Sequence, residues 1–172
     1  FPSREEDRDS RGNGTFTIEP RSSVTLDYRT DSSQRLSYRF EFDRRGEAIE
    51  GDSYQGSLGV TWRPIDRVNF GARARYQERD GWLLWQGGRD FATFETEEWR
   101  PTLDLDYFLS AKQQLRFSAQ WVAIKAAERN NFLVPMRTGD LIEVTPDVEN
   151  DDFAISRVNL QLRYRWELAP LS

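Results

Sequence analysis

The chain has 172 residues, a net charge of −5 at pH 7, and neither cysteine nor histidine. The missing residue types exclude thiol catalysis, disulfides, Ser-His-Asp hydrolysis and zinc sites built from His or Cys. Hydrophobic residues make up 37% of the chain, and it has no run of about 18 apolar residues, which excludes a membrane-spanning helix. The mild charge, without a contiguous basic block, gives no basis for nucleic-acid binding.

Residues 1–12 are highly charged and show no periodic pattern, so we expect a loop or disordered leading segment there. From residue 13 onward, apolar and polar residues alternate in several segments. This period of two predicts β-strands, because successive strand side chains point to opposite faces. The first two strands are weak predictions, a partial one over residues 15–19 and another over residues 22–29.

Residues 35–45 give the first clear strand. One face of it would be apolar: Leu36, Tyr38, Phe40 and Phe42. The other face would be polar: Ser37, Arg39, Glu41 and Asp43. Residues 67–77 and 156–168 show the same alternation, and weaker copies cover residues 56–62, 101–107 and 114–123.

The clear segments approach the roughly 9 to 11 residues that a tilted strand needs to cross a bilayer, whereas strands of soluble domains average about five or six. Short connections at residues 30–34, 63–67 and 110–113 alternate with longer ones at 46–52, around 80–97, and at 129–151. Transmembrane barrels have short periplasmic turns and long outer loops. We therefore predict an all-β fold, an antiparallel transmembrane β-barrel over residues 13–172 or the C-terminal part of a larger one, with about 7–8 strands in this chain.

In such a barrel the ionic face would line the interior. The residues that we expect to face the lumen are Arg39, Glu41, Asp43, Arg73, Arg75, Asp104, Asp106, Arg116, Arg163 and Arg165. Both signs of charge are present, so ionic bracing of the wall is the preferred interpretation, ahead of a weakly selective path for solutes. Aromatic residues near the short turns would form an interfacial girdle: Tyr28, Trp62, Tyr107, Phe108 and Trp166.

Two further segments carry candidate binding residues. Trp82 and Trp85 could stack on a sugar, although packing within the protein is the preferred interpretation. A cluster of carboxylates could bind calcium, but it lacks the spacing of an EF-hand, so a solvated charge run is preferred: Asp147, Glu149, Asp151 and Asp152. We expect no other metal site, no cofactor and no catalytic residue, and hence not an enzyme.

The segment LQLRYRWELAPLS at residues 160–172, with QLRFSAQWVAIKA at 114–126, resembles the C-terminal region of a bacterial family of unknown function. Residues 11–20 and 58–77 also resemble barrel strands of that family. Its members join a periplasmic family-9-type carbohydrate-binding module to an outer-membrane β-barrel, so the resemblance implies the bacterial outer membrane and a link to carbohydrate. The chain lacks the module and the aromatic terminus usual for barrels, and we expect it to be part of a longer protein.

The function favoured at this point is a segment of an outer-membrane β-barrel in a transport or envelope-structural protein. Its expected partners are outer-membrane lipid, other envelope proteins and, through the resemblance, carbohydrate. The alternative is a soluble all-β binding module, a sandwich or lipocalin-like barrel, with the apolar face turned inward. The two hypotheses differ in which face of the strands is dry.

Overall fold

A computed structural model describes residues 4–6, 8–145 and 151–167, which form strands and turns but no helix. None of these residues forms a helix long and apolar enough to cross a bilayer. The strands are β1 (Arg4–Glu6), β2 (Phe16–Ile18), β3 (Ser23–Arg29), β4 (Leu36–Gly46), β5 (Asp52–Ile65), β6 (Val68–Gly87), β7 (Asp90–Ser110), β8 (Gln113–Leu133), β9 (Ile142–Val144) and β10 (Phe153–Trp166).

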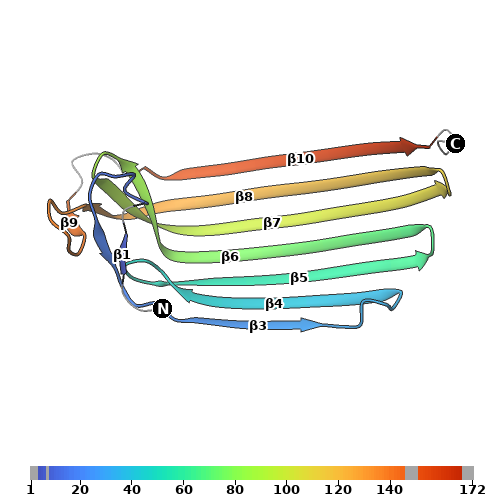
Figure 1. Ribbon diagram of the computed structural model, residues 1–172, viewed down its shortest axis with the longest axis horizontal. Helices are drawn as coiled ribbons and strands as arrows, with labels where there is room; N and C mark the ends of the chain where they lie inside the picture. The colour runs from blue at the N-terminus through green and yellow to red at the C-terminus, as the bar shows by residue number, and fades with distance from the viewer. Residues whose placement is uncertain (1–3, 7, 146–150, 168–172) are drawn as a thin grey trace, which may run out of the picture.

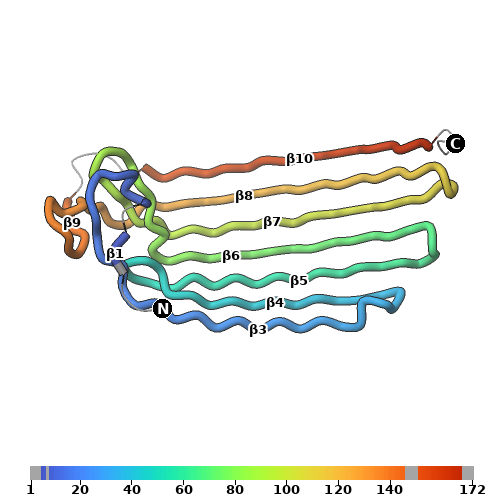
Figure 2. Tube along the Cα trace, in the orientation of Figure 1, coloured from blue at the N-terminus to red at the C-terminus, as the bar shows by residue number. Residues whose placement is uncertain are grey.

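Seven strands form one curled antiparallel sheet, which has the form of a half-barrel (Figure 1). Their spatial order is β10-β8-β7-β6-β5-β4-β3, and the short strand β9 pairs with the end of β8. The trace in Figure 2 steps from each strand to its neighbour as far as β8. The all-β antiparallel fold predicted from the sequence is confirmed, while these strands do not close into a barrel.

The strand register aligns the alternating patterns of neighbouring strands. Leu36, for example, lies opposite Trp62, and Trp62 lies opposite Phe70. The same row continues through Leu105 and Phe117 to the last strand. Because a slip of one residue would turn a whole strand over, this alignment keeps one face of the sheet apolar and the other polar.

Short turns join the strands at one end of the sheet, which we call the turn end. Asp31 organises the connection between β3 and β4, because its carboxylate accepts hydrogen bonds from the backbone N–H and the hydroxyl of Ser33, both at 2.8 Å. These bonds favour the ionised form and lower the pKa of Asp31 below its ordinary value. Their contribution to stability is therefore present above the ordinary pKa and is lost as the pH falls through the lowered one.

The opposite end of the sheet carries a compact structure, which we call the end cap. It consists of β1, β2, β9 and the distal parts of β6 to β8, and its strands β1 and β9 lie together at that end in Figure 1. Its centre is a cluster of buried apolar side chains: Phe16, Ile18, Phe91, Phe132 and Val134. The rings of Phe16 and Phe91 meet edge to face, with centroids 5.3 Å apart. Ordinary hydrophobic burial therefore stabilises this end of the molecule.

The end cap differs from the sequence prediction in three places. The segment at residues 129–151, expected to be an outer loop, contains the end of β8 and the short strand β9, which pair with each other. The segment around residues 80–97, expected to be an outer loop, instead continues β6 and β7 as a hairpin that turns near Gly88. The leading segment 1–12, expected to be a loop, contains the three-residue strand β1, which pairs with β2. Tertiary packing explains the hairpin and the pairing of β1 with β2, because the hairpin and β2 share the buried cluster.

Two glycines hold the β4–β5 loop against β6. Gly51 and Gly81 have φ angles of +87° and +105°, a region that favours glycine. A Cβ on Gly51 would overlap the carbonyl oxygen of Asp80, and one on Gly81 would overlap that of Glu50. The close approach therefore depends on both residues lacking a side chain.

Substituting Gly51→Ala should loosen the end cap, because the new Cβ meets the Asp80 carbonyl and the left-handed conformation costs about 1–2 kcal/mol. Limited proteolysis of the folded protein should show faster cleavage at residues 46–52 and 80–90. Gly56→Ala is the matched control, because no atom lies within 4 Å of the position that its Cβ would take. Equal protease resistance of the Gly51 variant and the unmodified protein would contradict this account.

Candidate functional site

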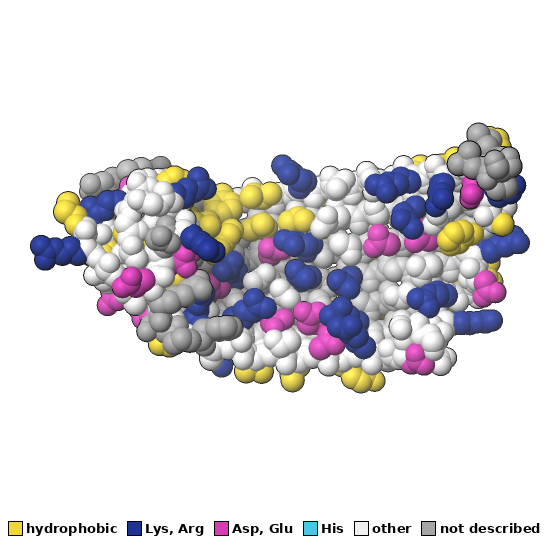
Figure 3. Space-filling model, viewed as in Figure 1, with side chains coloured by type: hydrophobic (Ala, Val, Ile, Leu, Met, Phe, Trp, Pro, Cys, Tyr) yellow, Lys and Arg dark blue, Asp and Glu magenta, His cyan; other side chains and the backbone are white. Residues whose placement is uncertain are grey.

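The polar face of the sheet is the candidate site. The register places the ten residues expected to face the lumen on this one face. Arg39, for example, lies in a row with Gly59 and Arg73, and Asp106 lies in a row with Arg116 and Arg163. Figure 3 shows the charged side chains spread over this face, with hydrophobic side chains at its margins and at the end cap.

Large apolar side chains are exposed on one face of the sheet. On β4, the side chain of Phe40 is 44% exposed, whereas Asp43 on the opposite face is 5% exposed. Leu162 on β10 is 68% exposed. Phe40, Phe70 and Leu162 all lie outside the buried apolar clusters of the described residues. Within the described part of the chain the apolar face is therefore uncovered, and on the polar face the carboxylates of β4 are sheltered while arginines such as Arg163 remain exposed.

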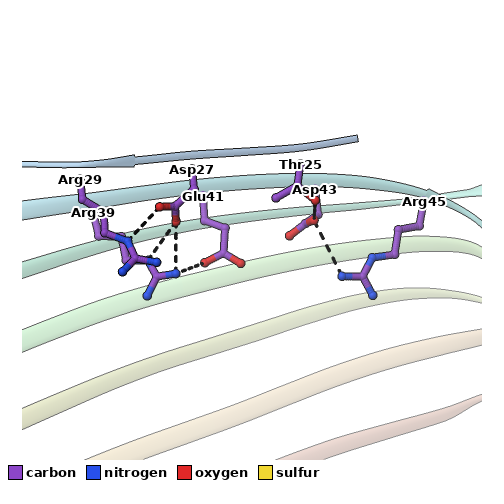
Figure 4. A network of polar contacts seen from close by, with 7 residues as sticks. All are labelled: Thr25, Asp27, Arg29, Arg39, Glu41, Asp43 and Arg45. Atoms are coloured by element: carbon purple, nitrogen blue, oxygen red, sulfur yellow. Dashed lines mark hydrogen bonds and ion pairs between the residues drawn. The ribbon is translucent and has the colours of Figure 1, made fainter. Parts of the chain in front are cut away.

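An arginine–carboxylate network connects β3 and β4 on the polar face (Figure 4). One Arg39 nitrogen lies 3.1 Å from Asp27 and 3.2 Å from Glu41, so a single guanidinium bridges two carboxylates. Arg29 contacts the same Asp27 at 2.8 Å. The planar guanidinium suits this role, because it donates several hydrogen bonds in fixed directions.

Further along β4, Asp43 is held between two strands. It accepts a hydrogen bond from the Thr25 hydroxyl at 2.5 Å, and an Arg45 nitrogen lies 3.8 Å away. These contacts compensate for the burial of its carboxylate.

A second group of contacts lies nearer β10. Arg116 on β8 donates to Asp106 on β7 at 2.6 Å, and Gln114 donates to the same oxygen at 3.1 Å. Arg100 and Glu98, both on β7, form an ion pair at 2.5 Å. The polar face is thus braced on both sides by contacts within and between strands.

Between these groups the face is hollowed. A pocket of about 400 Å³ is lined by the side chains of Arg29, Arg39, Arg73 and Asp104, among others. Glycine creates part of this space, because a Cβ on Gly59 would lie 3.7 Å from the Arg73 Nε. A second hollow of about 270 Å³ is lined mainly by small polar and amide side chains: Thr102, Asp104, Ser118, Ala119, Gln120, Asn159 and Gln161.

The two candidate stacking residues lie in the end cap. Trp82 packs against the apolar cluster of Ala92, Phe94 and Ala126, and Arg79 lies 5.0 Å from its ring centroid. Trp85 packs against the cluster around Phe16, and Arg11 lies 4.2 Å from its centroid. Each ring therefore already has a guanidinium near one side. Sugar stacking remains a prediction.

The calcium candidates are only partly described, since Asp147 and Glu149 lie outside the described residues. Asp152 accepts a hydrogen bond from the Glu128 backbone N–H at 2.8 Å, and the Asp151 N–H donates to the Glu128 carboxylate. Among the residues that the structure describes, no group of three or more potential metal ligands gathers.

The sequence prediction omitted several residues of the polar face. Asp27 and Arg29 belong to a strand with a weak pattern, and Glu98 and Arg100 precede the start that was expected for their strand. Arg157 was also omitted, although it alternates correctly with Arg163. Alternation within the predicted strands could have found Asp27, Arg29 and Arg157, whereas Glu98 and Arg100 required the longer β7 of the structure.

Substituting Arg39→Gln should lower the free energy of unfolding by about 0.5–1 kcal/mol, because it removes the bridge between Asp27 and Glu41. Urea unfolding, followed by tryptophan fluorescence, would measure the change. Arg73→Gln is the matched control, because Arg73 forms no ion pair with the described residues. If both variants lost the same stability, the bracing role of Arg39 would be refuted.

Comparison with known proteins gives one match. No curated protein and no solved structure matches this chain. The model of a family described as a domain of unknown function, DUF5916, matches residues 4–172. A family of unknown function is what the sequence resemblance predicted, whereas the carbohydrate-binding module and the outer-membrane barrel that it implied remain predictions. Because the match covers nearly the whole chain, the protein belongs to the DUF5916 family.

Proposed function

We propose that this chain forms part of the wall of a bacterial outer-membrane β-barrel, in a protein with a transport or envelope-structural role. The supporting observation is the apolar face itself, on which large apolar side chains of neighbouring strands are exposed while carboxylates of the polar face such as Asp43 and Glu41 are sheltered. Water does not favour such a surface, and large exposed apolar patches mark contacts with a membrane or a partner. Lipid would cover the apolar face, and the polar face would line a wet interior.

The height of the apolar band suits an outer membrane. On β7 it runs from Trp99 to Tyr107, about 27 Å along the strand at roughly 3.4 Å per residue. At a strand tilt of about 40° this corresponds to about 20 Å along the membrane normal, close to the apolar band of about 25 Å in known barrels.

A row of charges borders the band on its end-cap side. Arg44, Glu78, Glu97 and Lys125 share the apolar face and form one row with Tyr54, just beyond the row of Tyr76 and Trp99. Arg44 is paired there with Asp52 at 2.7 Å. Charges at this height would lie in the headgroup region, where their burial cost is small.

Aromatic residues border the band on its turn-end side. Trp62, Tyr107, Tyr164 and Trp166 are all exposed on the apolar face, as an interfacial girdle requires. Phe108 does not fit this girdle, because it pairs with Gln114 and alternates onto the polar face.

The two edge strands of the sheet, β3 and β10, also support a barrel. β3 pairs only with β4, and β10 pairs only with β8, within the described residues. In hydrocarbon each unpaired backbone group would cost several kcal/mol. In the intact protein, further strands would therefore pair with these edges and complete the barrel.

Carbohydrate handling and envelope partners have separate support in the proposal. Carbohydrate handling enters only through the family resemblance, and envelope partners only through the location. No pair of carboxylates on the polar face suggests catalysis, since those of Asp27, Glu41, Asp43, Glu98 and Asp106 are engaged by arginines. We therefore propose no enzymatic role.

The alternative, a soluble all-β module, would need something other than lipid to cover the apolar face. Fractionation of the intact protein from cells distinguishes the two. We expect it in the outer-membrane fraction, released only by detergent. Recovery as a monodisperse monomer in the aqueous fraction would overturn the membrane proposal.

A pair of arginine substitutions tests which face meets lipid. Leu103 lies in the middle of the apolar band and is 44% exposed, so Leu103→Arg should destabilise the folded protein by about 2–4 kcal/mol in a bilayer. Gln120→Arg is the control, because Gln120 lies opposite Thr102 on the polar face. Urea unfolding in lipid vesicles would measure both. A larger loss for Gln120→Arg than for Leu103→Arg would reverse the assignment of the faces.

A further inference from the structure

Three pairs of arginines face each other across neighbouring strands of the polar face. The register places Arg29 opposite Arg39, Arg75 opposite Arg100, and Arg116 opposite Arg163. Like charges directly opposite one another destabilise an antiparallel pair. Because this arrangement occurs three times on one face, negative charge from outside each arginine pair must offset the repulsion.

The carboxylates of this chain supply only part of that charge. In each pair one arginine at least is neutralised, since Arg39, Arg100 and Arg116 each form an ion pair with an acidic residue. Arg75 and Arg163 form no ion pair with the described residues.

Three more arginines of the polar face are in the same position. One is Arg165, which lies opposite Gln114 and forms no ion pair with the described residues. Arg73 lines the larger hollow, and Arg157 lies opposite Val122 on β8, but neither forms an ion pair within the described part of the chain. Two acids, Asp104 on β7 and Glu167 directly after β10, are similarly unpaired in the residues described. The chain as a whole has a net charge of −5, so the unpaired positive charge is a property of this face.

We propose that the polar face attracts and passes small anions, such as carboxylated or phosphorylated solutes, which lie between the unpaired arginines. This inference rests on the proposed function, because it takes the face to be the wall of a wet barrel interior. A low-dielectric wall concentrates the field of the guanidinium groups in the interior. Arginine and lysine rings are the usual basis of anion selectivity in pores, and guanidinium binds carboxylate and phosphate in a bidentate manner.

The competing explanation is that strands outside the described residues supply carboxylates that pair with these arginines. The face would then be neutral and would show no preference for anions. Ion selectivity therefore distinguishes a conducting face from one that is only braced.

The test uses the intact protein, reconstituted in planar bilayers with a gradient of potassium chloride. The reversal potential should show a preference for chloride over potassium, and the double variant Arg75→Gln/Arg163→Gln should lower the permeability ratio several-fold. Arg137→Gln is the control, because it removes a positive charge from an exposed residue outside the sheet. Its selectivity should equal that of the unmodified protein.

Three outcomes would overturn the inference. They are a preference for potassium, a double variant with unchanged selectivity, and a protein that inserts into the bilayer without conducting. In each case the protein has entered the membrane, so the result would contradict the anion path but not the proposed barrel. A protein that stays in the aqueous fraction would overturn both proposals.

Discussion

The whole arrangement depends on hydrogen-bonded strand pairing in a single register. Each strand has an apolar and a polar edge, and only the alignment of neighbouring strands joins these edges into continuous faces. A shift of one residue in β6, for example, would place Arg73 and Arg75 among the apolar side chains of β5 and β7. The short turns and the ion pairs between strands, such as that of Arg116 with Asp106, oppose such a shift.

Two different kinds of interaction stabilise the two parts of the molecule. The end cap has a water-excluding centre around Phe16, Phe91 and Val134, so it can be understood as a small soluble structure. The long strands have no such centre, and their polar face relies on ion pairs and hydrogen bonds. Isolated ion pairs at partly exposed sites contribute little, so the strands require a further environment for their apolar face.

The charge distribution follows the same division. The network around Asp27 and Arg39 neutralises itself, whereas the region of Arg73, Arg75, Arg157 and Arg163 retains positive charge. A wall that served only as a scaffold would gain from pairing every charge. The uneven distribution suggests that part of the face has a role in contacting solutes.

The sequence alone determined the strands of the sheet and the two faces of each, because alternation at a period of two is a local property. It therefore predicted that Arg39, Arg73 and Arg163 share a face. It did not predict the hairpin at residues 80–90, because the apolar residues there pack against β2, which is distant in the sequence. Likewise, the facing arginine pairs and the ion pairs of Asp27 with Arg39 and of Asp106 with Arg116 depend on which residue lies opposite which. Only the tertiary structure decides that register, because many strand alignments are compatible with the same local pattern.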